Sequence, residues 1–223
     1  RCTANVDGRA NCGNRRYRTN RQCYKIQGGM NHDQAFKIAV SICKKLQPYC
    51  EPDRLRIAGS IRRKKPEVKD IEIVCLPKIV TVQTPDLFGG NNRQEIHSEF
   101  VHIVCEGLGR VVKGQPTGRY MQIEIPEGIN LDLFMPQPAD YFRQFAIRTG
   151  SADYSARVIA GGWVRAGWVG TEHGLRRADE CRRIADTKWE CIANNPTLPP
   201  VWESEEDFFT FIGVDCIAPE KRI

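Results

Sequence analysis

The sequence predicts an α+β protein in which strands come first and helices dominate later. Short runs of alternating apolar and polar residues occur between residues 54 and 134. Two of these runs are joined by Pro126, Glu127 and Gly128, which is a hairpin signal. From residue 138 onward the apolar spacing becomes helical. We therefore expect a mixed β-sheet with flanking helices, followed by a smaller α/β subdomain.

The first helix is expected after Asn31, which can cap it, and it should end before Pro48. Its expected core-facing residues fall at helical spacing: Phe36, Ala39, Val40 and Cys43. The elements expected next are a strand at 54–58, a helical turn at 61–65, a strand at 70–76, a loop at 77–93, a helix around 96–104, and strands at 109–113, 120–125 and 129–134.

Beyond residue 138 a helix is expected through Ile147, a pause at 149–151 and a second helix from 152 to about 166. Ser204 and Asp207 resemble a capping arrangement before a last helix. We expect three parts: a basic flexible arm at 1–30, a sheet subdomain at 31–137 and a smaller subdomain at 138–223.

Composition and charge narrow the function. With 41% hydrophobic and 27% charged residues among 223, and no apolar run near the roughly 18 residues that a bilayer requires, the chain is expected to be globular, without a membrane partner or signal peptide. Residues 1–30 hold seven Lys or Arg and one Asp, which equals the net charge of +6 of the whole chain. A basic arm on a neutral body points to a polyanionic partner.

Ten cysteines occur without any C-x-x-C pair. A zinc site among Cys2, Cys12, Cys23 and His32 is therefore disfavoured. Reduced, buried thiols such as Cys75 are the preferred interpretation, which favours an intracellular setting.

Three carboxylates are the strongest chemical signal. Strand alternation puts Asp70 and Glu72 on one face, and Asp132 on the outward face of the strand at 129–134. Acids gathered on a sheet repel one another unless a divalent cation lies among them, and Mg²⁺ is the natural occupant. Ten residues before Asp70, Gly59 and Ser60 open a helical turn that can approach a phosphate, and Arg63 can bind phosphate oxygens with its guanidinium fork.

These segments resemble the polymerase-beta-like X family of DNA polymerases from about residue 30 to the end. The resemblance is carried by residues 58–63, 70–72, 131–134, 149–151, 168–175 and 205–222. It implies a nucleotidyltransferase palm followed by a thumb-like nucleotide-side subdomain, in the compact form of the small viral members.

The family's roles are carried over residue by residue. The resemblance implies that Asp70, Glu72 and Asp132 are catalytic and bind two Mg²⁺ ions, for which Mn²⁺ can substitute. The implied nucleotide-binding residues are Gly59, Ser60, Arg63, Gly150 and Ser151, and those near the sugar are Ile147, Arg148 and Thr149. A basic cluster of Arg176, Arg177, Arg182 and Arg183 is expected to contact DNA phosphates.

Three departures from the family pattern matter. Glu72 stands where the family usually has Asp, Ile147 and Arg148 replace a Tyr-Phe pair, and no segment corresponds to the domain that removes 5′-deoxyribose phosphate. The expected function is addition of deoxynucleotides to a DNA primer 3′ end, in short-gap repair synthesis. The expected partners are nucleoside triphosphates and primer–template or gapped DNA. We expect a monomer that is intracellular or encoded by a virus. The alternatives are a template-independent or ribonucleotide-adding nucleotidyltransferase and a non-catalytic DNA-end-binding module.

Overall fold

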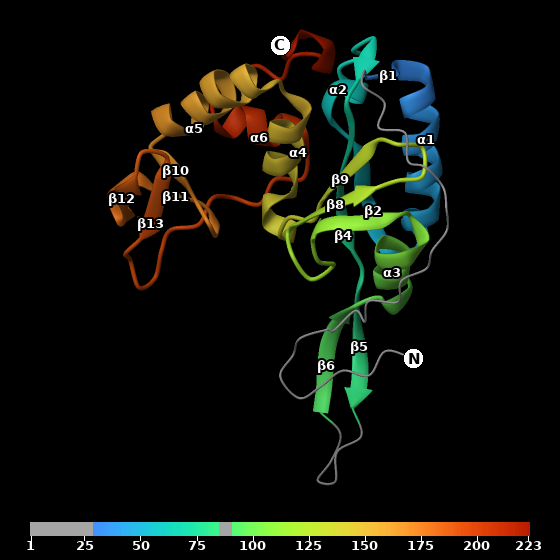
Figure 1. The fold of residues 1–223 in the computed structure, drawn as a ribbon. Coiled ribbons are helices and arrows are strands. Elements are labelled where there is room, and N and C mark those ends of the chain that lie inside the picture. Colours follow the sequence, from blue (N-terminus) through green and yellow to red (C-terminus); the bar gives the residue numbers. More distant parts are fainter. Residues whose placement is uncertain (1–28, 85–90) are drawn as a thin grey trace.

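The computed structural model describes residues 29–84 and 91–223 (Figure 1). Nearly all of the predicted basic arm, with Cys2, Cys12 and Cys23 of the disfavoured zinc site, therefore lies outside the described residues. Five strands form the main sheet in the order β2-β4-β9-β8-β7, and only the pairing of β4 with β9 is parallel. They are β2 (Cys50–Ile57), β4 (Asp70–Pro77), β7 (Arg110–Gly114), β8 (Tyr120–Glu124) and β9 (Asn130–Phe134). The α+β prediction is confirmed.

One face of this sheet is covered by α1 (His32–Leu46) and α3 (Ser98–His102) (Figure 1). The Asn31 side chain accepts a hydrogen bond from the Asp33 backbone N–H, so the predicted cap is confirmed. The predicted apolar face was displaced by one residue, because Phe36 is 46% exposed. The helix instead buries residues that recur every three to four positions: Ala35, Ala39, Ile42 and Leu46.

The other face is covered only in part. Along β4, Asp70, Glu72, Val74 and Leu76 point to this face, since side chains alternate in a strand. Val74 and Leu76 pack with α4 (Tyr141–Thr149) in a second hydrophobic cluster that also contains Phe134, Phe142 and Phe145. The two acids therefore lie where the cover of α4 ends, at the start of the same strand.

The loop predicted at 77–93 is wrong. Residues 79–84 and 91–96 pair as an antiparallel hairpin, β5 (Ile79–Thr84) and β6 (Asn91–Ile96), which projects from the body (Figure 1). The clustered Gly and Asn residues favoured a loop, but the β-branched residues Val80, Thr81 and Val82 favour a strand. Two further short strands, β1 (Met30–Asn31) and β3 (Glu67–Val68), pair beside α1.

The C-terminal part contains α4, a π-helical segment (Tyr154–Ala160), α5 (Gly161–Arg165) and α6 (Glu205–Phe211). Ser204 and Asp207 form a reciprocal capping box at α6, as predicted. A four-stranded sheet in the order β11-β10-β13-β12 lies at one end (Figure 1): β10 (Trp168–Thr171), β11 (Gly174–Arg177), β12 (Cys181–Ala185) and β13 (Lys188–Cys191).

Two further observations bear on the sequence predictions. Among the described residues, no helix is long and apolar enough to cross a bilayer. Cys50 and Cys75 are buried, as expected for Cys75, and the other five described cysteines are half-buried. Of these five, Cys43, Cys105 and Cys216 pack against the hydrophobic clusters.

Candidate active site

The parallel pairing of β4 with β9 brings the three predicted acids together on one face. Glu72 is the register partner of Asp132, and Asp70 is the partner of Asn130. Since alternate residues share a face, Asp70, Glu72 and Asp132 all lie on the side that α4 leaves open. The turn α2 (Gly59–Arg62) lies beside the start of β4. The backbone N–H of Ala58, the residue before the turn, donates to the Glu72 carbonyl at 2.8 Å.

The charges of these acids are not balanced. Burial raises the pKa of Asp70 above its usual range, and the neighbouring Asp132 raises it further. Burial and then Asp70 raise the pKa of Glu72 to about 7, against the opposing charges of Arg148 and Arg63. A pKa raised in this way means that the ionised carboxylates are unfavourable until further positive charge is supplied.

Asp132 is oriented by two neighbours on β8. The Tyr120 hydroxyl donates to Asp132 Oδ1 at 2.8 Å and Gln122 Nε2 donates to the same oxygen at 3.0 Å. Burial and this hydrogen bond raise the pKa of Tyr120 to about 12, so the tyrosine stays a donor. Both bonds go to Oδ1, which leaves Oδ2 available for another interaction. The sequence reasoning missed Tyr120 and Gln122, although alternation puts them on the face of the acids.

The donor set suits a hard cation. Within residues 29–84 and 91–223, no three His, Cys, Asp or Glu side chains converge closely enough to form a ready-made metal site. The three carboxylates still offer the oxygen ligands that Mg²⁺ prefers, on one face and with uncompensated negative charge. These residues fit a divalent cation, provided that their side chains turn toward a common point.

The turn at Gly59 and Ser60 fits closely against the acids. Gly59 has φ +62°, and a Cβ atom at this position would lie 1.9 Å from Glu72 Oε2. Only glycine meets both requirements. The Ser60 hydroxyl is buried and has no hydrogen-bond partner, and the same holds for Arg63 Nε. Buried polar atoms without partners are expensive, so both atoms point to an absent ligand.

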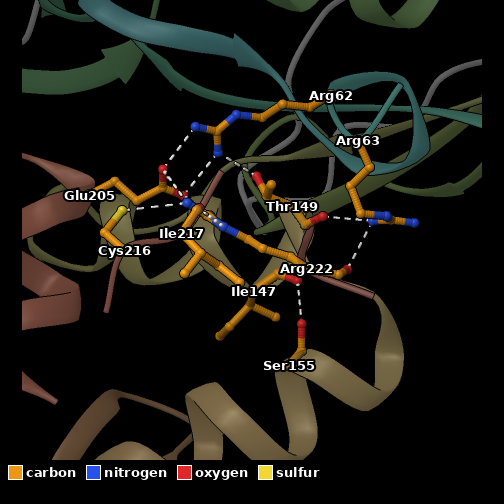
Figure 2. Close-up of polar contacts among 10 residues, drawn as sticks. Arg62, Arg63, Ile147, Thr149, Ser155, Glu205, Cys216, Ile217 and Arg222 are labelled. Carbon is orange, nitrogen blue, oxygen red and sulfur yellow. Dashed lines mark hydrogen bonds and ion pairs between the residues drawn. The ribbon is translucent and has the colours of Figure 1, made fainter. Parts of the chain in front are cut away.

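Arg63 and its neighbour Arg62 connect this turn to the C-terminal part (Figure 2). Arg63 Nη1 donates to the Thr149 and Gly150 carbonyls at 2.6 and 3.0 Å, so this nitrogen holds the 149–150 turn. Arg62 Nη1 donates to Thr149 Oγ1 at 2.7 Å. The binding of phosphate by Arg63 therefore stays a prediction that concerns its remaining nitrogens.

Glu205 accepts hydrogen bonds from two arginines that are far apart in the sequence, Arg62 and Arg222, and we call these three residues the Glu205 triad. Arg62 donates to both carboxylate oxygens at 2.9 and 2.8 Å, and Arg222 does so at 2.7 and 3.3 Å (Figure 2). Burial alone would raise the pKa of Glu205, but the two arginines hold it below its usual value. The triad ties α2 to the C-terminal part, and nothing in the local sequence pattern revealed it.

The residues predicted near the sugar have separate contacts. The guanidinium of Arg148 lies 4.0 Å from the Phe134 ring centroid, close enough to Glu72 and Asp132 for their charges to act on it. The Ile147 carbonyl accepts a bond from the Ser155 hydroxyl at 2.8 Å. Ser151 Oγ accepts one from the Tyr154 N–H at 3.1 Å, so this serine starts the helical segment that follows.

The predicted arginine cluster is not a single cluster. Arg176 and Arg177 belong to β11, whereas Arg182 and Arg183 belong to β12, and these strands are the opposite edges of the four-stranded sheet. Arg182 pairs with Glu190 at 2.7 Å, and Arg177 lies 5.5 Å from the centroid of the Trp168 ring. Strand order in a sheet does not follow from sequence order, which is why spacing along the chain misled.

A cavity of about 550 Å³ opens beside the acids. It separates the main sheet from the β10–β11 turn, and it is lined by both signs of charge, including Glu72, Asp132, Lys113, Arg119, Arg148 and His173. Its size is in the range of small-molecule sites.

Comparison with solved structures identifies the fold. Two crystal structures of Leishmania infantum polymerase beta, a ternary P/T complex and a ternary gap complex, both superpose with a TM-score of 0.60. The P/T complex is 17% identical in sequence, and the match covers 90% of this chain and 78% of the polymerase chain. The gap complex is 16% identical, and the match covers 89% of this chain and 72% of the polymerase chain. The chain has the polymerase beta fold. No protein-family model and no curated protein matches the sequence.

At this identity the similarity shows the polymerase beta fold alone, and it confirms the resemblance deduced from the motifs at that level. In this fold the acids, the glycine turn and the 149–151 turn lie around one open face. The roles of the individual residues are a matter for proposal.

Proposed function

We propose that the protein is a nucleotidyltransferase that adds deoxynucleotides to a DNA primer 3′ end, with short gaps as its substrate. The observation that carries this proposal is the juxtaposition of three carboxylates on one face, two of them with raised pKa, with a glycine-serine turn whose buried Ser60 Oγ and Arg63 Nε lack partners. Acidic oxygens suit divalent cations, and the turn's unpaired donors suit phosphate oxygens. The polymerase beta fold supports this combination.

In this proposal Asp70, Glu72 and Asp132 hold two Mg²⁺ ions, which would stabilise the attacking and leaving oxygens when bound. Tyr120 and Gln122 fix the Asp132 carboxylate through Oδ1, so that Oδ2 faces the primer terminus. The 3′-oxygen forms a bond to the α-phosphorus, and the bond from that phosphorus to the pyrophosphate oxygen breaks.

The other residues bind and position substrates. Ser60 and Arg63 hold the triphosphate, and Gly150 and Ser151 lie beside the sugar and base. Residues 31–137 act as the palm and 138–223 as the nucleotide-side subdomain of a monomer. The arginines on β11 and β12 contact DNA phosphates on two separate edges, and the basic arm adds affinity that does not depend on base sequence.

Primer extension tests the proposal. Wild-type protein is assayed on gapped, recessed and single-stranded DNA with each dNTP and rNTP. We expect extension of the gapped DNA with dNTPs, and loss of at least about a thousandfold in Asp132→Ala, because a ligand of the reacting metal is removed. Asp33→Ala, whose side chain is 87% exposed on α1, is the matched control.

The assay also separates the alternatives. Extension of single-stranded DNA alone, or preference for ribonucleotides, would replace the gap-filling proposal with another nucleotidyl transfer. DNA binding without extension under any of these conditions would identify a binding module. An Asp132→Ala variant within tenfold of wild type would show that Asp132 has another role.

A further inference from the structure

Cys181 and Cys191 face each other across the edge hairpin of the four-stranded sheet. They are Cα partners in the antiparallel register of β12 and β13. Both are half-buried, so small solutes can reach them. This pair does not belong to the candidate active site.

The hydrogen-bond pattern of the ladder fixes the type of pair. The Ile192 N–H donates to the Glu180 carbonyl at 3.0 Å, which marks residues 180 and 192 as a hydrogen-bonded pair. Such pairs alternate with non-hydrogen-bonded pairs, so Cys181 and Cys191 form one of the latter. There the Cα atoms lie about 4.5 Å apart, within the range of about 4.4–6.8 Å that disulfides accept.

The side chains are already in contact. The Cys181 and Cys191 thiols share a hydrogen bond, and burial followed by the neighbouring Cys191 raises the pKa of Cys181 to about 11. The sulfurs therefore need little movement to bond. The fold holds the two chains side by side without any help from a covalent link.

A second thiol pair provides a contrast within the protein. Cys50 and Cys75 also share a hydrogen bond, but both are buried. Their register partners are other residues, since Cys50 lies opposite Pro77 and Cys75 lies opposite Leu55. This pair lacks both the solvent access and the facing position of Cys181 and Cys191.

The hairpin is also weakly anchored. Its only register contact with the rest of the sheet is the parallel pair of Thr171 with Trp189, and β12 is an edge strand with exposed residues from Arg182 to Ala185. Edge hairpins with few pairings open locally at low free energy. A cross-link between the strands would restrict such opening.

We propose that Cys181 and Cys191 are a modification site that forms an intramolecular disulfide, with a peroxide as the oxidant. The Cys191 thiolate attacks a peroxide oxygen, which gives a sulfenic acid and releases the other oxygen as water after protonation. The Cys181 thiol then attacks the sulfenic sulfur, and its proton leaves with the departing hydroxyl as a second water. Two thiols lose two electrons and two protons, and one hydrogen peroxide becomes two waters.

The test is peptide mapping of the folded full chain after mild treatment with hydrogen peroxide, followed by blocking of free thiols and digestion with trypsin. Cleavage after Arg177, Arg182 and Lys188 places the two cysteines on different peptides, 178–182 and 189–221. We expect these peptides to appear linked, lighter by two hydrogens, and to separate on reduction. Because 189–221 also holds Cys216, the same experiment in Cys216→Ser must still give the link.

Two controls keep the proposal falsifiable. Cys181→Ser must abolish the link, and Cys50 and Cys75 must stay reduced in the same sample. Before full digestion, cleavage of the oxidised folded protein after Arg182 and Arg183 should slow by at least about tenfold, because the strands can no longer separate. Separate oxidation of the two sulfurs, a link from Cys181 to any other cysteine, or a link that forms only in denaturant would overturn the proposal.

Discussion

Glu72 and Glu205 are two carboxylates of one chain whose electrostatic surroundings shift their pKa values in opposite directions. Glu205 is bound by the forks of Arg62 and Arg222, and its pKa is lowered. Glu72 faces Asp70 and Asp132 with no partner of comparable quality, and its pKa is raised to about 7. The first arrangement satisfies the carboxylate within the protein, as a structural role requires. The second leaves it dependent on a charge from outside, as a binding role requires.

The largest effect on stability is expected from breaking the satisfied carboxylate. Glu205→Gln leaves the buried Arg222 and the half-buried Arg62 with a neutral partner, so the free energy of unfolding should fall by about 3–5 kcal/mol in urea denaturation at pH 7. Glu206→Gln, an exposed acid in the same first turn of α6, is the control. A loss equal to that of the control would show that the Glu205 triad contributes little.

The pH dependence of this loss has a defined sign. A lowered folded pKa contributes stability that is present above the unfolded value of 4.5 and is lost as pH falls through the folded pKa. The difference between wild type and Glu205→Gln should therefore be full at pH 6–7 and shrink below pH 4.5. An unchanged difference at low pH would contradict the assigned charge state.

For Glu72 the direction of the comparison is reversed. Glu72→Gln removes an unfavourable charge, so without divalent cations it should raise the free energy of unfolding by about 1–3 kcal/mol at pH 8. A raised folded pKa makes the folded state lose stability as pH rises from 4.5 through about 7, so this gain should vanish below pH 4.5.

Added Mg²⁺ should then reverse which protein is the more stable, wild type or Glu72→Gln. At the proposed site, Mg²⁺ would bind the folded protein and stabilise it by mass action, so we expect a larger rise in thermal midpoint for wild type than for Glu72→Gln. Equal rises in both proteins, together with no gain at pH 8, would remove Glu72 from the proposed metal site.

A smaller effect is expected at Arg148, whose charge acts on Glu72 and Asp132. Arg148→Met keeps an apolar chain but removes the charge over the Phe134 ring, and should lower the free energy of unfolding by about 1–2 kcal/mol without divalent cations. Added Mg²⁺ should reduce this loss, because it supplies the missing charge. Arg157→Met, at an exposed position of the following helical segment, is the control. A loss that Mg²⁺ leaves unchanged would indicate that Arg148 acts by packing alone.

The smallest effect is expected at an exposed ion pair that spans the same two parts of the chain as the Glu205 triad. Lys64 and Glu220 pair at 2.6 Å, with side chains that are 71% and 37% exposed. Glu220→Gln should leave the urea midpoint unchanged, since solvent and salt screen such pairs. A measurable loss would mean that exposed pairs also hold the two parts together.

Local signals predicted the local structure. Alternation located β8 and β9 to within a residue, Asn31 and Ser204 located two helix starts, and the face shared by Asp70 and Glu72 followed from the period of a strand. That Asp132 joins Asp70 and Glu72 in one site was implied by the resemblance to a family, and the parallel register that puts Glu72 beside Asp132 was not predicted.

Contacts between residues far apart in the chain could not be predicted from the sequence. Arg62 and Glu205 are 143 positions apart, and no period or propensity relates them. The separation of Arg177 from Arg182 depends on strand order within a sheet, which five residues of spacing do not reveal. Tyr120 and Gln122 could have been found by applying to β8 the same alternation that revealed the acids.

The close fit of Gly59 against Glu72 limits how this site can evolve. A side chain at position 59 would occupy the space of the Glu72 carboxylate, 1.9 Å from Oε2, and would also have to adopt a φ of +62°. Shortening residue 72 to Asp would free some of that space without relieving the backbone. Position 59 therefore accepts a side chain only if the Glu72 carboxylate moves away and the backbone keeps its φ of +62°, so residues 59 and 72 constrain each other.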